Sequence, residues 1–279
     1  MDCSLRKERG LDMLVKATEL NREAILTYCN EEPSINLFII GDIELYGFDT
    51  DFQEVWIQEK ESKILGVVLK YHDNFIIYSK ETMDYQEVVT LLSKHKVSVI
   101  SGKATILNEL YPLVKDEYNK KEMNFAELTD DRLLERNIQG VIKAAVEDAG
   151  LIAAAYGDID EFKYLYSDQL EEREKQIVGR ISSGEGIHMF IKEKDTILSH
   201  GNTAAETTTS AMIGGVMTHK DHRRKGLARM VVSALSLDLL SRGKHACLFY
   251  SNEASESLFK ALGFKDIDKW IVLGGKNNE

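Results

Sequence analysis

The sequence predicts an α/β (α+β) chain built from two similar halves, each with a central mixed sheet flanked by helices. Three observations favour this fold class. Apolar residues alternate along the chain between the 3.6-residue spacing of helices and the two-residue spacing of strands. One order of elements (helices, three strands, helix, strand, helix) occurs twice, which indicates a duplicated fold. The length of 279 residues also exceeds a typical single domain of roughly 100–200 residues.

The first half contains the first copy of this order. Helices are expected over residues 21–30 and 35–46, and strands over residues 52–58, 64–71 and 75–79. The polar residues 72–74 would turn the chain and make a hairpin of the last two strands. A helix over 85–92, a strand over 97–101 and a helix over 104–113 complete the copy. The charged stretch 119–122 marks the expected boundary between the halves.

The second half repeats the order more clearly. A helix is expected from Ser167 to its glycine stop at Gly184, followed by strands over 187–191, 196–205 and 211–218. A helix then begins at Leu227, and a strand over 246–250, a helix between Asn252 and Gly263 and a strand over 270–273 follow. The glycine pair 214–215 inside a strand indicates a bulge or the close approach of a ligand.

Composition and charge exclude several classes of protein. With 43% hydrophobic and 29% charged residues, the chain has the balance of a globular protein rather than of a disordered one. The net charge of -11 disfavours nucleic acid as a partner, because affinity for phosphate backbones comes from clustered Lys and Arg. No apolar run is long enough for a membrane helix, and the first residues lack the apolar stretch of a secretory signal. We therefore expect a cytoplasmic protein without a membrane partner.

Cysteine and histidine spacing predicts no metal site. The three cysteines are far apart and form no Cys-x-x-Cys pair, and the histidines have no ligand-like spacing. Cys247 lies in an apolar run, so we expect it to be buried.

One basic loop stands out in this acidic chain. It follows the expected strand that ends in Val216, Met217 and Thr218, and it runs into the next helix through Arg223, Arg224, Lys225, Gly226, Leu227, Ala228 and Arg229. The first amides of a helix have no partner within the helix, and the helix dipole attracts anions to that end. Gly226 would let the backbone approach a phosphate closely. The loop therefore predicts a binding site for a pyrophosphate.

These residues resemble the GNAT superfamily of acetyl-CoA-dependent N-acyltransferases. The family signature Arg/Gln-x-x-Gly-x-Gly/Ala is matched by Arg223, Gly226 and Ala228, and the preceding Val-x-Thr by Val216 and Thr218. An Asn-led helix ending in Leu-Gly-Phe, here from Asn252 to residues 262–264, is similar to the family's second motif. The resemblance implies tandem GNAT-like domains, each with a mixed, mostly antiparallel twisted sheet. Residues 124–279 would form the acetyltransferase domain, and residues 1–123 a degenerate copy without the cofactor motif.

The resemblance also implies a mechanism. Two strands of such a domain splay apart, and the pantetheine arm of acetyl-CoA lies in the gap, paired with the main chain of Val216 and Thr218. An amide there would polarise the thioester carbonyl, and Asn252 would contribute to cofactor binding. An amine of a small molecule or peptide would then attack the acetyl group directly. The protein is expected to act as a monomer or homodimer.

The catalytic residues depart from the family pattern. Phe259 stands where the family often has a proton-donating tyrosine, and Tyr250 is the nearest substitute. The family often has a glutamate base a few residues before the Val-x-Thr, and in this sequence that position lies near Met212, which cannot accept a proton. Glu206 or a chain of waters would then be the proton acceptor. An alternative function is a sensor that binds acyl-CoA without turning it over. The acidic residues Asp158, Asp160 and Glu161 are candidates for attracting a cationic acceptor.

Overall fold

The chain forms two compact units in a computed structural model that describes residues 13–48, 50–157 and 169–276. The N-unit comprises Met1–Phe125 and Asp268–Glu279, and the C-unit comprises Ala126–Ile267. Both boundaries fall inside strands, β6 (Tyr118–Leu128) and β12 (Lys265–Gly275). The units thus differ from the expected domains 1–123 and 124–279, since the end of the chain belongs to the N-unit. The reason is the antiparallel pairing of β12 with β5 (Val99–Lys103), from Trp270 opposite Lys103 to Gly274 opposite Val99.

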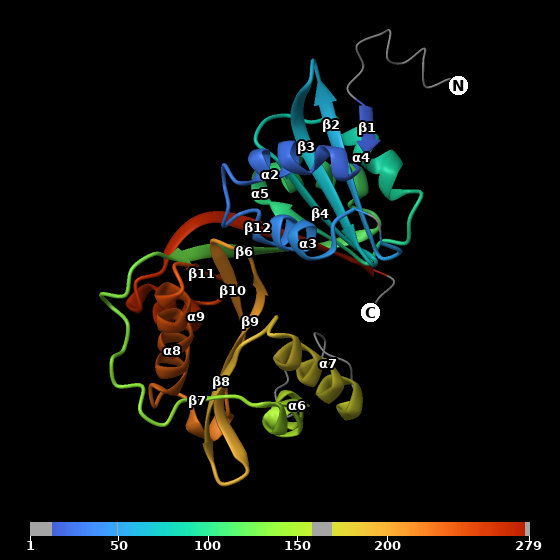
Figure 1. Ribbon diagram of the computed structural model, residues 1–279. Coiled ribbons are helices and arrows are strands. Elements are labelled where there is room, and N and C mark those ends of the chain that lie inside the picture. Colours follow the sequence, from blue (N-terminus) through green and yellow to red (C-terminus); the bar gives the residue numbers. More distant parts are fainter. Residues whose placement is uncertain (1–12, 49, 158–168, 277–279) are drawn as a thin grey trace. The chain divides into compact units, whose positions relative to one another are not determined.

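The N-unit has a sheet with helices on both faces. Its strands lie in the order β1-β2-β3-β4-β5-β12, and every pair except β4 with β5 is antiparallel. Figure 1 shows α2 and α3 on one side of this sheet and α4 and α5 on the other. The bounds not yet given are β1 Met13–Lys16, η1 Glu19–Asn21, α2 Arg22–Cys29, α3 Leu37–Tyr46, β2 Gln53–Lys60, β3 Lys63–Tyr71, β4 Asn74–Ser79, α4 Tyr85–Leu92 and α5 Ala104–Val114.

The C-unit has the same arrangement around the strand order β11-β10-β9-β8-β7, in which β10 with β11 is the parallel pair. Its elements are β7 Ile142–Lys143, η2 Val146–Asp148, α6 Ala149–Gly157, α7 Leu170–Ser183, β8 His188–Glu193, β9 Thr196–Glu206, β10 Ser210–Thr218, η4 Lys220–His222, α8 Leu227–Ser241, β11 His245–Tyr250 and α9 Glu253–Ala261. Both units therefore have the predicted mixed, mostly antiparallel sheet flanked by helices.

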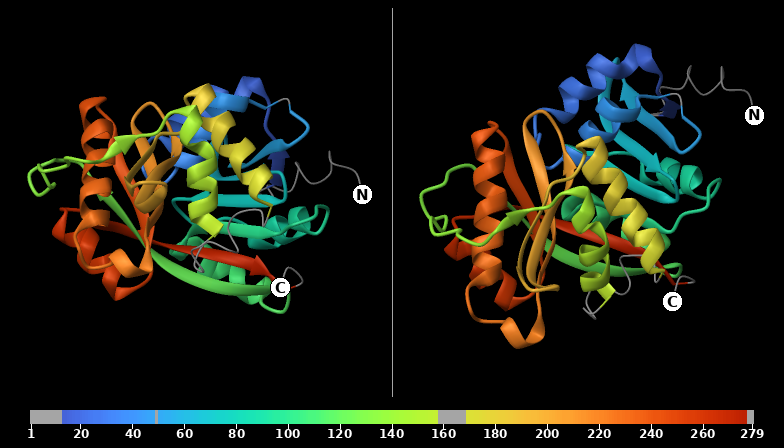
Figure 2. Two further views of the ribbon diagram at one scale, coloured as in Figure 1. Left: turned by 90° about the horizontal axis from the view of Figure 1, so that it is seen from below. Right: turned by 60° about the horizontal axis from the view of Figure 1, so that its bottom comes forward.

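Two apolar layers cover the faces of the C-unit sheet. α8 and α9 pack on one face through residues such as Val231, Leu235 and Phe259. α6 and α7 pack on the other face through Ile152 and Ile177, and Figures 1 and 2 show the two pairs of helices on opposite sides. β10 lies between these layers, so its backbone is held from both sides.

Most sequence expectations for individual elements are confirmed. The helix over 85–92, the two-residue turn between β3 and β4, and the stop at Gly184 with φ +76° all occur where expected. Cys247 is buried, as predicted. The strands β1 and β6 were not predicted. The charged stretch 119–122, where the boundary between the halves was expected, is the exposed part of β6. Asp158, Asp160 and Glu161 lie outside the described residues.

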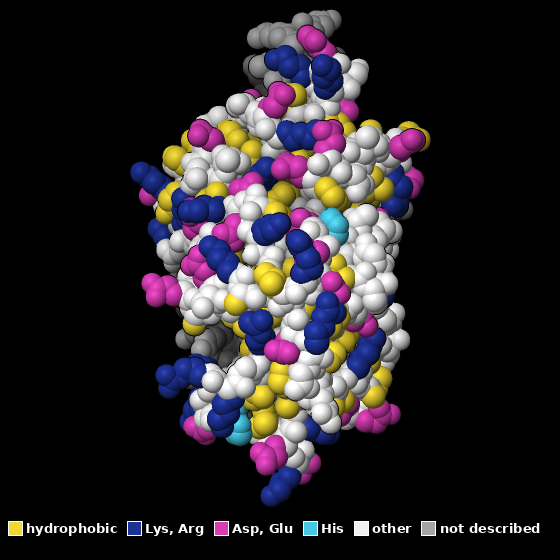
Figure 3. All heavy atoms as spheres, turned by 90° about the vertical axis from the view of Figure 1, so that its left-hand side faces the viewer, with side chains coloured by type: hydrophobic (Ala, Val, Ile, Leu, Met, Phe, Trp, Pro, Cys, Tyr) yellow, Lys and Arg dark blue, Asp and Glu magenta, His cyan; other side chains and the backbone are white. Residues whose placement is uncertain are grey.

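Within the described ranges, no helix has the length and apolar character needed to cross a bilayer. On the face shown in Figure 3, Lys and Arg side chains are interspersed with Asp and Glu.

A close backbone approach in the N-unit gives a test of the fold. A Cβ on Gly102 of β5 would lie 2.4 Å from the carbonyl oxygen of Ile77 in β4. We expect Gly102→Ala to lower the free energy of unfolding by about 1–3 kcal/mol, because overpacking forces the backbone to shift. Urea unfolding would measure the loss. Gly274→Ala in β12, where a Cβ meets nothing within 4 Å, is the matched control. Equal stability of the two variants would contradict the packing of β5 on β4.

Candidate cofactor site

The parallel pair β10 and β11 separates soon after it begins. Ser210, Ala211 and Met212 pair with His245, Ala246 and Cys247, and the register goes no further among the described residues. β10 continues to Thr218 and remains paired with β9 on its other edge. The edge of β10 that faces β11 thus presents backbone donors and acceptors without ladder partners over its second half. Such an edge can accept an extended ligand as an added strand.

β10 carries a bulge at this point. Its register against β9 shifts between Gly214 and Met217, and Gly215 has φ +56°. A Cβ on Gly215 would lie 2.3 Å from Oδ1 of Asn202 and 2.5 Å from Oη of Tyr156, so only glycine fits. The bulge indicated by the glycine pair is therefore confirmed, and it turns the residues that follow.

The loop after β10 ends at an uncapped helix. η4 (Lys220–His222) starts the loop, and Arg224 and Gly226 both have positive φ, +61° and +81°. Gly226 is the N-cap of the 15-residue helix α8 and, having no side chain, makes no capping hydrogen bond to the first amides of the helix. A Cβ on Gly226 would meet nothing within 4 Å. The amides of Leu227, Ala228 and Arg229 lie in the first turn, where an α-helix provides no acceptor for them, as an anion site requires.

The basic side chains of the loop do not all point to this helix end. Arg223 Nε donates to the carbonyl oxygen of Thr218 at 3.2 Å and so ties the loop to the end of β10. Arg224 and Lys225 are exposed. Arg229 turns away, since its Nη2 donates to Leu133 O at 3.3 Å and its Nε lies 3.8 Å from a Glu135 oxygen. Arg224 and Lys225 are thus the cations available to a bound phosphate, and Arg229 supplies its amide.

Tyr250 ends β11 in a buried, hydrogen-bonded position. Its hydroxyl donates to Asp266 Oδ1 at 2.5 Å, and its ring packs 6.0 Å from the ring of Phe259. Burial and the hydrogen bond to Asp266 raise the pKa of Tyr250 to about 12. The phenol stays protonated at neutral pH, but its proton is directed to Asp266. Phe259 is a core residue, as its apolar character suggests.

Glu206 lies at the opposite end of β10 from the basic loop. It pairs with Ala211 at the start of that strand and is bridged to Arg242 at 2.7 Å and Lys244 at 2.8 Å. Burial raises the pKa of Glu206, but these cations and the Thr203 hydroxyl outweigh it and hold the pKa below its usual value. The structure therefore does not bring Glu206 to the loop, and an ion-paired carboxylate of low pKa is a weak base.

Asn252 caps α9 as predicted. Its Oδ1 accepts a hydrogen bond from the Ser255 amide at 2.9 Å. A contact of Asn252 with a cofactor stays a prediction.

The N-unit offers a natural comparison, because it also has a parallel pair of strands, the first of which leads to a helix. β4 and β5 pair from Asn74 with Val99 to Ile77 with Gly102. There the following helix, α4, is capped by its own carboxylate: Asp84 Oδ1 accepts from the amides of Gln86 at 2.9 Å and Glu87 at 3.2 Å. Lys103 at the end of β5 forms ion pairs with Glu32 at 2.9 Å and with Asp268 at 3.2 Å, so its charge is already compensated. An anion would have to displace Asp84 to reach this helix.

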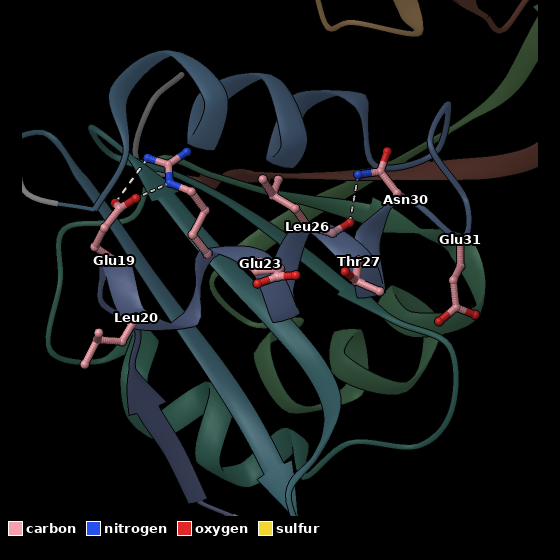
Figure 4. A pocket seen from close by; sticks show the side chains of 8 residues that line it. Glu19, Leu20, Glu23, Leu26, Thr27, Asn30 and Glu31 are labelled. Atoms are coloured by element: carbon pink, nitrogen blue, oxygen red, sulfur yellow. Dashed lines mark hydrogen bonds and ion pairs between the residues drawn. The ribbon is translucent and has the colours of Figure 1, made fainter.

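A separate hollow in the N-unit is unsuited to a polyphosphate. It measures about 740 Å³ and lies over η1 and α2, where Figure 4 shows the Glu19, Glu23 and Glu31 side chains around it. Arg22 is hydrogen-bonded to Glu19, and Asn30 donates to the Leu26 carbonyl oxygen at 2.8 Å. The carboxylates would repel an anionic ligand.

Sequence reasoning missed a buried polar cluster beside the bulge. His200 contacts the carbonyl oxygen of Gly215, the hydroxyl of Tyr156 and the imidazole of His188. The signal available in the sequence was weak: His200 and Asn202 share one face of a strand that is otherwise apolar or small.

Comparison with known structures identifies the fold as that of tandem GNAT proteins. One similar structure is a tandem GNAT protein from the clavulanic acid biosynthesis pathway, with 12% identity, a TM-score of 0.59, and 93% of this chain and 97% of that chain covered. Another is a GCN5-related N-acetyltransferase from Sphaerobacter thermophilus, with 12% identity, a TM-score of 0.62 and 94% of both chains covered. A GCN5-related N-acetyltransferase-like protein from Streptococcus suis 89/1591 has 13% identity, a TM-score of 0.59 and coverage of 93% and 100%.

Part of the sequence also matches a family model. Residues 199–272 match the model of the FR47-like protein family, a region that contains β10, the basic loop and α8. No curated protein matches the chain. The resemblance to the GNAT superfamily is thus confirmed as a resemblance of fold and of this region.

The geometry of the bulge can be tested through the stability of two glycine variants. We expect Gly215→Ala to lower the free energy of unfolding by about 1–3 kcal/mol, because the added Cβ collides with Asn202 and Tyr156 and the backbone has positive φ. Gly214→Ala is the matched control, since its Cβ would lie 3.4 Å from the nearest atom, the Cβ of Ala204. Chemical denaturation of both variants would compare them. A stable Gly215→Ala variant would refute the bulge geometry.

Proposed function

We propose that the C-unit binds acetyl-CoA and transfers its acetyl group to an amine of a small-molecule or peptide acceptor. The observation that carries this proposal is the early separation of β10 from β11 with an uncapped helix N-terminus after the open end of β10. A strand-like edge followed by an anion site suits a ligand with an extended amide-bearing arm and a pyrophosphate. The GNAT fold of the chain and the FR47-like region agree with this ligand.

The basic loop would hold the pyrophosphate of this ligand. The amides of Leu227, Ala228 and Arg229 would donate to phosphate oxygens, and Arg224 and Lys225 would add charge-assisted hydrogen bonds. Arg223 acts indirectly, because its hydrogen bond to Thr218 holds the loop against the strand. These contacts would fix one end of the ligand and leave its acyl end beside β10.

The separated edge of β10 would orient the acyl group. The main chain of Val216, Met217 and Thr218 would pair with the amide groups of the ligand arm, as a neighbouring strand would. A backbone amide at this edge would also stabilise the negative charge that develops on the carbonyl oxygen during attack. No side-chain charge is needed for either task.

The thioester supplies an activated acetyl group. The nitrogen of a neutral acceptor amine forms a bond to the carbonyl carbon, the carbon–sulfur bond breaks, and the sulfur leaves as thiolate. The nitrogen then loses a proton, which water carries to solvent or to a base such as Glu206. Tyr250 is the candidate donor to the thiolate. Of the two side chains, Tyr250 lies on a strand that borders the separated edge, whereas Glu206 lies at the distant end of β10.

We also propose one cofactor site per chain. The N-unit, residues 1–125 with 268–279, would be a degenerate GNAT-like copy whose anion site is occupied by the Asp84 carboxylate. The chain would act as a monomer or homodimer, without nucleic acid and without a resident metal ion, as its sequence leads us to expect.

Removing the anion site should abolish binding of coenzyme A. We expect the double substitution Arg224→Ala with Gly226→Glu to raise the dissociation constant by about a hundredfold or more. Loss of a charge-assisted hydrogen bond removes about 1.5–3 kcal/mol of binding free energy, and the new carboxylate repels phosphate. Isothermal titration calorimetry with coenzyme A would measure the change. Lys175→Ala, an exposed site on α7, is the control and should bind as the wild type does. If the double variant bound coenzyme A with unchanged affinity, the proposed function would be refuted.

A second candidate function is an acyl-CoA sensor that binds without turnover. The observation in its favour is the state of the candidate catalytic groups: Phe259 has no proton to give, the Tyr250 hydroxyl is held by Asp266, and Glu206 is ion-paired. The fold would then serve as a binding module, and the acyl group would remain on the ligand.

Turnover separates the two functions. Incubating the protein with acetyl-CoA and a panel of amines, and measuring the thiol released, should give amine-dependent turnover by the wild type. Tyr250→Phe should lower kcat by about tenfold or more while keeping coenzyme A affinity, because one proton donor is lost. Phe259→Leu, a core change nearby, is the control for packing. Binding without turnover on any amine would favour the sensor, and full activity of Tyr250→Phe would exclude that tyrosine as the donor.

A further inference from the structure

A buried chain of polar side chains ends on the bulge of β10. His200 of β9 places its Nδ1 3.0 Å from the carbonyl oxygen of Gly215 and 3.3 Å from the Tyr156 hydroxyl. On its other side, His200 Nε2 lies 3.0 Å from Nδ1 of His188 in β8. All three side chains are at most 3% exposed. Four elements, α6, β8, β9 and β10, are thus linked through the His200 imidazole.

The contacts define which nitrogen carries each proton. A carbonyl oxygen can only accept, so the Nδ1 of His200 must be the donor to Gly215. His200 Nε2 is then the acceptor of the Nδ1–H of His188. The Nε2 of His188 carries the remaining lone pair, and it has no hydrogen-bond partner among the described residues. The order of donors is therefore set from β8 to the bulge.

The surroundings keep both imidazoles neutral. Burial, and the nearby charge of Arg180 from α7, lower the pKa of His188 to about 4. Burial and the neighbouring His188 lower the pKa of His200 to about 3. Tyr156 faces His200 from α6, and Arg180 is itself bound to the carbonyl oxygens of Glu185, Thr203 and Ala204. The hydrogen-bond order thus persists across the neutral pH range.

We propose that His200 is a positioning residue that holds the Gly215 carbonyl and thereby fixes the direction of the backbone amides after the bulge. This inference rests on the proposed function, because those amides border the edge of β10 that would orient the acyl group. A peptide unit is planar, so fixing the carbonyl of Gly215 also fixes the amide of Val216. Without the imidazole donor, a buried carbonyl would lack a partner and the glycine could rotate.

Two carboxamide variants separate positioning from simple packing. In His200→Asn, the side-chain amide nitrogen takes the place of Nδ1 and can still donate to Gly215. In His200→Gln, the amide nitrogen reaches the place of Nε2 instead, so the donor to Gly215 is lost while a polar side chain remains. The two variants differ mainly in where that donor sits.

The test measures kcat per coenzyme-A-binding site, with sites counted by calorimetry. We expect His200→Asn to retain kcat within about threefold and His200→Gln to lose about tenfold or more, the usual effect of removing a buried hydrogen bond. The affinity for coenzyme A should change little in either variant, since the pyrophosphate loop lies elsewhere. A merely structural role would lower thermal stability without separating kcat between the two variants, and that result would overturn the inference.

A second measurement does not depend on turnover. Hydrogen–deuterium exchange of residues 213–218 should be faster in His200→Gln than in His200→Asn, with the wild type as reference. Wild-type protein that fails to bind coenzyme A would refute the proposed function, whereas the exchange difference would still support the role of His200. Equal exchange in both variants would overturn that role even if the wild type is an active enzyme.

Discussion

The short parallel ladder between β10 and β11 is the constraint on which the candidate site depends. Backbone donors and acceptors inside a sheet require partners, so a strand edge that opens within the fold must be satisfied by side chains, water or a ligand. After Met212 the edge of β10 loses its ladder partner, while β9 and the helices α6 and α8 keep the strand in place. A rigid edge without a neighbouring strand is a preorganised binding surface, because no further ordering of the protein is needed when a ligand pairs with it.

The two units show that architecture alone does not make such a surface. Each has a parallel pair of strands and a helix that follows, yet the helix ends differ in one residue type. Asp84 satisfies the first amides of α4 with its own carboxylate, whereas Gly226 leaves those of α8 open. A carboxylate at a helix N-terminus stabilises the helix, and the same position cannot also bind phosphate. The N-unit therefore has a more stable helix end, whereas the C-unit keeps the helix end that the proposed anion site requires.

The sequence predicts the architecture well because each element depends on local signals. Apolar periodicity, the Asn252 cap and the glycine stops lie within a few residues of the elements that they define, and the glycine pair marks the bulge. The strand β6 was missed because its first half is charged and exposed, and its pairing partners are distant in sequence. The boundary of the compact units was missed for the same reason, since the pairing of β12 with β5 joins residues about 170 positions apart. The His188–His200 contact likewise depends on strand register, which no local pattern specifies.

If the proposed function holds, the proton balance allows transfer without the tyrosine that the GNAT resemblance leads one to expect at Phe259. A phenol with a pKa of about 12 is a poor acid toward a thiolate, whose conjugate acid has an ordinary pKa near 8.5, so the difference opposes proton transfer. A thiolate, however, is a stable leaving group near neutral pH and can depart as an anion before water protonates it. The harder requirement is a neutral attacking amine, since an alkylamine with a pKa near 10.4 is mostly protonated at pH 7. Under the proposed function, a weak donor such as Tyr250 would therefore raise the rate without being essential, and a base beside the acceptor amine would raise it further.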